Sequence, residues 1–186
     1  MKKTLLALAA LFFAFRAEAA PQHLVIDHTN STLTFTANVN GSPSKGSFKT
    51  FDADIAFDPK ALNESYANVT VELKSVESAY EEVAKQLKTI PWFNIDQFPQ
   101  ATFKSTKFLA KGGNDYIAEG TLTLKGVALP VSAAFTLVRF DDQGAEIKGS
   151  SMVKRLMFGI GQGEWQDTSA VKNEVLVEFH VTAKKK

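Results

Sequence analysis

The sequence PWFNIDQFPQATFKS, residues 91–105, marks the place where the pattern of the chain changes. It contains four aromatic residues and two prolines. Pro99 has no backbone N–H to donate, and its ring disfavours helical backbone angles at Phe98. A helix that precedes this stretch must therefore end near Pro91, and an extended strand begins only after Pro99. We predict a compact turn whose aromatic rings are buried against a strand-rich body.

On both sides of this turn, apolar residues recur at every second position, which is the period of a half-buried strand. Clusters of Gly, Pro, Asn and Asp separate the alternating runs, as is typical of turns. Phe48 has the opposite parity to the run that follows it, which predicts a β-bulge near Thr50. The predicted strands lie at residues 33–39, 51–57, 69–73, 101–104, 116–124, 129–137, 145–151 and 175–183.

One segment has helical spacing instead. Its apolar residues between Tyr80 and Leu87 are three or four positions apart, and Ser78 with Glu81 fits a capping box. This predicts one short helix between the third and fourth strands. The fold class is therefore all-β, with eight antiparallel strands in up-and-down order. Eight strands close into a barrel just wide enough for side chains or one small ligand, although a two-sheet sandwich has the same alternation.

The N-terminus has the features of a secretory signal peptide. Lys2 and Lys3 precede an apolar run from Leu5 to Phe15, and Ala17-Glu18-Ala19 is an A-x-A cleavage site. The run is too short to span a bilayer as a helix. We expect residues 1–19 to be removed and residues 20–186 to form a single domain that does not insert stably in a membrane. A retained anchor is the alternative.

Charge and cysteine content narrow the class of protein further. Cleavage leaves 18 basic and 19 acidic residues, a net charge of −1, and no basic surface for nucleic acid. The chain has no cysteine, so an exported protein of this size depends on its core rather than on disulfides. We expect a periplasmic location, with secretion from the cell as the alternative. The sequence does not indicate an oligomeric state.

Catalytic and metal-binding patterns are not found in the sequence. His23, His28 and His180 have no zinc-site spacing, and we interpret each as a surface residue. Asp52 and Asp54 share one face of a predicted strand, opposite its apolar face, which favours solvation. We therefore predict no catalytic residue, no metal and no cofactor.

The run Gly159-Ile160-Gly161-Gln162-Gly163 resembles a phosphate-binding loop only superficially. It lacks the Lys and Ser or Thr of a P-loop, and no helical pattern follows it. We interpret it as a flexible or bulged loop beside Trp165.

The apolar faces of the strands are predicted to point into one interior. Several of these positions are Ala or Val, and Ala145, Gly149 and Ser151 add a further stretch of small residues. Small residues that face one another leave volume for a ligand, although an ordinary packed core fits the same pattern. Trp92, Phe93 and Phe98 are predicted to cover one end as a lid. The predicted interior ligand-binding residues are Phe35, Val39, Leu122, Leu124, Val131, Ala133, Phe135, Val175, Val177 and Phe179.

Four motifs in a fixed order resemble those of the YceI-like proteins, which are exported lipocalin-like barrels that bind polyisoprenoid lipids. The similarity covers nearly the whole mature chain. The motifs are Gly46-Ser47-Phe48 with residues 51–58; Trp92-Phe93, Phe98-Pro99, Ala101-Thr102-Phe103 and Ser105; residues 120–127 with Pro130-Val131; and Phe158-Gly159-Ile160-Gly161 with Trp165.

The sequence departs from the family pattern at three places. Asp27-His28-Thr29-Asn30-Ser31 keeps only the Asp and the Ser of the family's D-P-x-H-S motif. Residues 83–87 keep only the Leu of its R-D-x-H-L motif, and Met157 stands where an acidic residue is usual. The resemblance therefore implies the fold, but the family's head-group contacts do not carry over.

The resemblance implies a binding protein, not an enzyme, that sequesters or carries a polyisoprenoid or a similar amphiphilic lipid, such as a quinone. A packed-core interaction or stress-protection module without a lipid is one alternative, and a lipid-modifying enzyme is another. Convergent His or carboxylate groups inside the barrel favour the enzyme. A core without a cavity favours the interaction module.

Overall fold

A computed structural model describes residues 21–186, so the predicted signal peptide and its cleavage site lie outside the described residues. Within residues 21–186, no helix is both long and apolar enough to cross a membrane. The strands are β1 (Gln22–Ile26), β2 (Thr32–Val39), β3 (Ser42–Phe48), β4 (Phe51–Phe57), β5 (Tyr66–Glu72), β6 (Val76–Ser78), β7 (Gln100–Gly112), β8 (Asp115–Leu124), β9 (Val127–Asp141), β10 (Gly144–Lys154) and β11 (Val171–Lys185). The helical segments are α1 (Glu81–Lys88) and the 3-10 turns η1 (His28–Asn30), η2 (Leu73–Ser75), η3 (Arg155–Phe158) and η4 (Gly163–Gln166).

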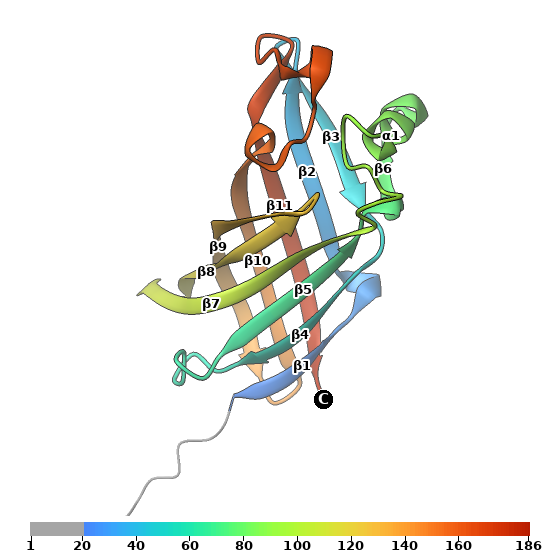
Figure 1. The fold of residues 1–186 in the computed structure, drawn as a ribbon. Coiled ribbons are helices and arrows are strands. Elements are labelled where there is room, and N and C mark those ends of the chain that lie inside the picture. Colours follow the sequence, from blue (N-terminus) through green and yellow to red (C-terminus); the bar gives the residue numbers. More distant parts are fainter. Residues whose placement is uncertain (1–20) are drawn as a thin grey trace, which may run out of the picture.

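The strands form one antiparallel sheet that closes on itself, because β1 pairs with both β4 and β11 (Figure 1). Three of the barrel strands are interrupted. The 3-10 turn η1 separates β1 from β2, residues 49–50 separate β3 from β4, and η2 separates β5 from β6. When each interrupted pair is counted as one strand, the barrel has eight strands. The structure therefore confirms the predicted barrel and excludes the sandwich.

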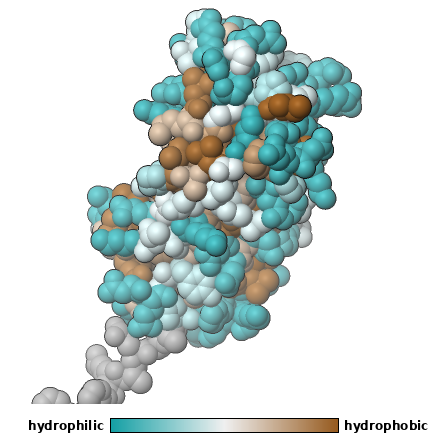
Figure 2. Space-filling view, in the orientation of Figure 1, coloured by the Kyte–Doolittle hydropathy of each residue, from teal (hydrophilic) through white to brown (hydrophobic). Residues whose placement is uncertain are grey.

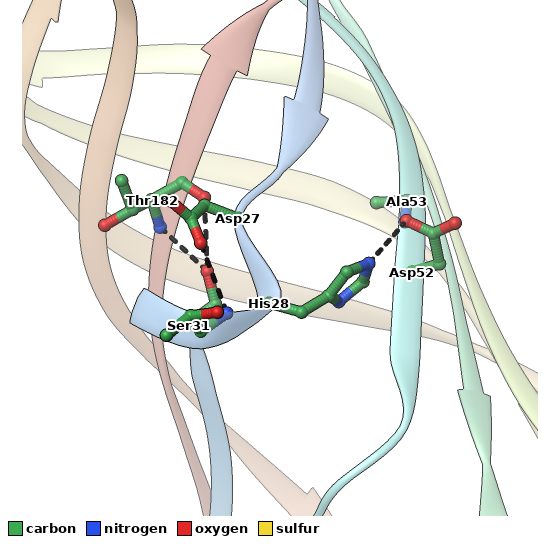
Figure 3. Close-up of polar contacts among 7 residues, drawn as sticks. Asp27, His28, Ser31, Asp52, Ala53 and Thr182 are labelled. Atoms are coloured by element: carbon green, nitrogen blue, oxygen red, sulfur yellow. Dashed lines mark hydrogen bonds and ion pairs between the residues drawn. The ribbon is translucent and has the colours of Figure 1, made fainter.

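The interruptions follow from the sequence. Residues 49–50 coincide with the change of parity after Phe48, where a bulge is predicted. At η1, Asp27 accepts a hydrogen bond from the backbone N–H of Thr29, and Ser31 binds both backbone groups of Thr182 on β11. Figure 3 shows Asp27 and Ser31 against Thr182 at this kink. The two residues retained from the first family motif thus hold backbone at a bend in the barrel wall.

The short helix lies where the sequence predicts it, but the predicted capping box is wrong. Ser78 belongs to β6 and pairs with Gly46, so its hydroxyl donates to the Lys45 carbonyl oxygen at 3.4 Å. The helix begins at Glu81, after Tyr80, and no side chain caps it. Strand pairing therefore prevents Ser78 from capping the helix. Since β6 pairs only with β3 among the described strands, the barrel wall ends there, and α1 lies beside this edge (Figure 1).

The aromatic turn has the predicted limits. Helix α1 ends at Lys88, before Pro91, and β7 begins at Gln100, directly after Pro99. The turn is fixed by backbone hydrogen bonds, including one from the Phe93 N–H to the Leu87 carbonyl oxygen at 3.0 Å.

Candidate ligand site

A large cavity extends along the inside of the barrel, with a volume of about 630 Å³. This volume lies within the range of small-molecule sites, about 300–1,000 Å³. Its walls come from the inward faces of the strands and are almost entirely apolar. The exterior carries the hydrophilic residues, and the apolar residues on the face shown in Figure 2 form separate patches. The ten residues predicted to face the interior all line this cavity, while their contact with a ligand stays a prediction.

Glycines in the wall allow three phenylalanine rings to lie against the sheet. A Cβ at Gly46 would overlap the ring of Phe35, and a Cβ at Gly149 would overlap the ring of Phe179. A Cβ at Gly120 would likewise overlap the ring of Phe103. Each ring therefore covers backbone on a neighbouring strand, an arrangement that pins register in sheets.

These glycine contacts modify the expectation that small residues leave open volume. Ala133, Ala145 and Ser151 do line the cavity. The space above Gly149, in contrast, is filled by the Phe179 ring.

One end of the cavity is closed by packed aromatic rings, which we call the aromatic end. Phe57 lies at its centre, with ring centroids 5.5 Å from Phe108, 5.8 Å from Tyr116, 6.1 Å from Phe135 and 5.9 Å from Phe140. All four pairs meet edge to face, the geometry that aromatic quadrupoles favour. Phe57 is 5% exposed, so this end of the barrel is sealed by apolar packing.

The opposite end is covered by α1 and by the two loop segments 89–99 and 155–170. Val83 and Leu87 of α1 line the cavity, together with Trp92 and Phe93 of the aromatic turn. The structure thus places two of the three predicted lid residues over the cavity. Phe98 does not line it, because its ring packs on Gly126 in the β8–β9 turn. The polar members of the lining at α1 and β3 are Ser44, Glu82 and Gln86.

Arg155 organises this second end, which we call the arginine end, and the sequence reasoning missed it. The side chain lines the cavity and is 3% exposed. Its guanidinium donates to five backbone carbonyl oxygens, those of Ile160, Gly161, Trp165, Val171 and Lys172, at 2.7–3.3 Å. Burial lowers the pKa of Arg155. The signal in the sequence was its position, because Arg155 continues the inward parity of Ile147, Gly149, Ser151 and Val153.

The glycine-rich loop after Arg155 supplies part of this cradle. Gly159, Gly161 and Gly163 have positive φ angles of 66°, 78° and 68°, which glycine adopts at little cost. A Cβ at Gly161 would overlap the guanidinium of Arg155. The loop therefore folds around a side chain of its own chain, beside Trp165 as predicted.

A second cation, Lys125, ties the arginine end together. Its ammonium donates to the carbonyl oxygens of Ile90 and Gly159, both at 2.8 Å. It thereby joins the β8–β9 turn to both covering segments. Burial lowers the pKa of Lys125.

The histidines lie away from the cavity lining. His28 is exposed and its Nε2 lies 3.8 Å from Asp52 Oδ1, as Figure 3 shows. His180 Nε2 lies 2.8 Å from Glu146 Oε1 on the neighbouring strand β10. Among residues 21–186, no group of three or more His, Asp or Glu side chains is arranged to hold a metal ion.

An eight-stranded antiparallel barrel around an apolar cavity, with one short helix beside the wall, defines the class of lipocalin-like barrels. Within that class, residues 24–183 match the family model described as the YceI-like domain. The chain therefore belongs to the YceI-like family, as the motifs in its sequence indicate.

Relatives of known sequence support this assignment. The chain is 34% identical over 148 residues to a UPF0312 protein of Pectobacterium atrosepticum, covering 74% of this chain and 73% of that protein. It is 33% identical over 162 residues to a UPF0312 protein of Vibrio parahaemolyticus, covering 84% and 86%.

Two solved structures have the same fold. Burkholderia cenocepacia BcnA is 33% identical, with a TM-score of 0.80 over 84% of this chain and 98% of that one. A domain from Saccharophagus degradans, described as polyisoprenoid binding and implicated in plant cell wall breakdown, has a TM-score of 0.71 over 89% of this chain and 99% of that one. At 16% identity, this second likeness concerns the fold alone.

Proposed function

We propose that this protein is a periplasmic binding protein that sequesters or carries a polyisoprenoid or a similar amphiphilic lipid in its barrel. The observation that carries the proposal is the cavity of about 630 Å³ with apolar walls. Apolar burial contributes about 25 cal/mol per Å², so a long chain gains affinity without specific polar contacts. The polyisoprenoid-binding description of the Saccharophagus degradans domain, which has the same fold, supports this ligand class.

Export is part of the proposal and rests on residues 1–19. Their charged start, apolar run and A-x-A site are those of a cleaved signal peptide. N-terminal sequencing of exported protein is expected to begin at Ala20. Exported protein that begins at Met1 would contradict a cleaved signal.

The cavity also bears on the two alternative functions. A packed-core interaction module has no need of an apolar cavity of this size. An enzyme needs convergent polar groups at the reacting atoms, whereas the one carboxylate among the described lining residues is that of Glu82, at the end covered by α1. We therefore propose binding rather than catalysis.

A matched pair of substitutions on β9 tests the proposal. Ala133 lines the cavity, and the adjacent Ala134 is exposed on the outer face. Ala133→Phe is expected to displace the lipid, while Ala134→Phe leaves it in place. The measurement is mass spectrometry of lipid extracted from equal amounts of folded wild type and both variants. Equal lipid in all three preparations would place the ligand outside the barrel, and no lipid in wild type would favour the interaction module.

A further inference from the structure

The arginine end contains a buried hydrogen-bond donor that has no acceptor. Trp92 lines the cavity and is 8% exposed, and its Nε1 is buried without a hydrogen-bond partner among the described residues. Buried donors in folded proteins are nearly always paired, and an unpaired one costs about 1–3 kcal/mol. A ligand atom that accepts a hydrogen bond from this indole would therefore remove the cost of the unpaired N–H.

The surroundings of Trp92 define what kind of atom fits. The ring of Trp165 lies 5.5 Å from that of Trp92, and Arg155 Cζ lies 5.8 Å from the Trp92 centroid. All three side chains line the cavity. The five hydrogen bonds of Arg155 to carbonyl oxygens use its full set of five N–H donors, and none of the ion pairs among the described residues includes it. The site thus has one free donor beside a fixed positive charge.

This combination selects among head groups. A positive charge repels an ammonium group, and it favours the negative end of a carbonyl dipole. The Arg155 charge would attract a phosphate, but all five N–H groups of Arg155 are already used, so the phosphate would lose its water and find a single free N–H for its several oxygens. A neutral carbonyl needs only one donor.

We propose that Trp92 Nε1 donates a hydrogen bond to a neutral carbonyl oxygen of the bound lipid, whose head lies at the arginine end. This inference rests on the proposed lipid-binding function and adds the polarity and the orientation of the ligand. The chain then extends towards Phe57 at the aromatic end. Because the Trp92 N–H is buried, we expect the indole to turn towards the adjacent cavity when the ligand binds.

The test uses two ligands that differ at one group. Phytone is a branched isoprenoid methyl ketone, and pristane is the hydrocarbon in which a CH–CH₃ group replaces its C=O. Their affinities are measured for wild type, Trp92→Phe and Trp165→Phe by displacement of a fluorescent lipid. Trp165→Phe is the matched control, because it makes the same substitution in the neighbouring ring. Comparison of the ratio of the two affinities isolates the hydrogen bond from general effects on packing.

The phytone-to-pristane affinity ratio is expected to fall about three- to tenfold in Trp92→Phe and to stay near the wild-type value in Trp165→Phe, as one neutral hydrogen bond predicts. A ratio unchanged in Trp92→Phe, or tighter wild-type binding of phytyl phosphate than of phytone, would overturn the Trp92 site and leave the lipid-binding proposal intact. Failure of wild type to bind either ligand would overturn both.

A second experiment follows ligand binding to wild type by NMR and uses the variants only to assign the signals. The chain has two tryptophans, so its proton–nitrogen NMR spectrum has two indole signals. The variants assign them. Phytone, but not pristane, is expected to move the Trp92 indole proton downfield. Equal responses to the two ligands would contradict the hydrogen bond.

Discussion

The two ends of the barrel are closed by different physical means. At the aromatic end, Phe57 of β4 meets four other rings edge to face, and those four rings come from the uninterrupted strands β7, β8 and β9. At the arginine end the barrel wall ends at β6, and Arg155 and Lys125 hold the covering loops through backbone carbonyls. Apolar packing over many contacts is hard to open locally, whereas loops held by a few polar contacts open at lower cost. If the barrel binds a lipid as proposed, we expect the ligand to enter at the arginine end.

The largest expected effect is at the aromatic end. Phe57→Ala removes the central ring of the cluster, and deletion of a buried Phe costs about 3–5 kcal/mol. We expect a loss near the top of that range, measured by denaturant unfolding. Phe93→Ala at the arginine end is the comparison, because Phe93 is also buried and also lines the cavity but has one aromatic contact, with Phe48 at 5.9 Å, where Phe57 has four. Its loss is expected near the bottom of the range. Equal losses would remove the distinction between the ends.

The next effect concerns the cation at the arginine end. Arg155→Lys keeps a positive charge but has three donors for the five carbonyl oxygens. At least two carbonyls lose their partners, so we expect a loss of about 2–3 kcal/mol in unfolding free energy. Hydrogen exchange is expected to rise in residues 89–99 and 155–170 and to stay unchanged around Phe57. Uniform loss of protection would show that the arginine end does not open by itself.

A smaller effect is expected in the wall between the two ends. A Cβ at Gly149 would overlap the Phe179 ring and lie 2.5 Å from the Ala134 carbonyl oxygen. Gly149→Ala is therefore expected to cost about 1–3 kcal/mol as overpacking. The substitution should also push the Phe179 ring towards the cavity and so reduce the amount of bound lipid. Lys148→Ala, on the exposed outer face of the same strand, is the control in the same extraction and melting measurements. Equal stability and equal bound lipid in the two variants would show that the Phe179 ring moves without entering the cavity.

The smallest effect is a pH dependence at the β1–β2 kink. The hydrogen bond from Lys184, supported by Asn30, lowers the pKa of Asp27 below its ordinary value. A carboxyl group whose pKa is depressed by folding stabilises the fold above its unfolded pKa, and this contribution is lost as the pH falls through the folded pKa. Asp27→Asn is therefore expected to be slightly less stable than wild type at pH 7 and to match it in strong acid. A difference that is constant with pH in thermal melts would assign the effect to Thr29 capping instead.

Alternation along the sequence predicted much of the fold. The parity of residues such as Phe35, Leu122 and Val177 depends only on the pleat, so the inward face follows from the period of two. The prolines at positions 91 and 99 fixed the limits of the aromatic turn, because their effect on the backbone is also local. The failed cap at Ser78 shows the limit of this reasoning, since pairing with Gly46 on a distant strand overrides a local pattern.

The candidate site was predicted less completely than the fold. Strand parity identified the apolar wall, but the polar end depends on Arg155, whose partners are backbone carbonyls up to 17 residues away. Carbonyl groups occur at every residue, so they leave no pattern in the sequence. Phe98 is the opposite case, a residue that was predicted to cover the cavity but does not. Its ring is adjacent to the lid in the sequence and packs on Gly126 instead.

Native mass spectrometry of lipid-free protein reloaded with phytone shows whether the ligand is held inside the barrel. We expect one phytone per chain in wild type and in Ala134→Phe, and none in folded Ala133→Phe. Binding to all three proteins, or to none, would contradict a ligand held inside the barrel.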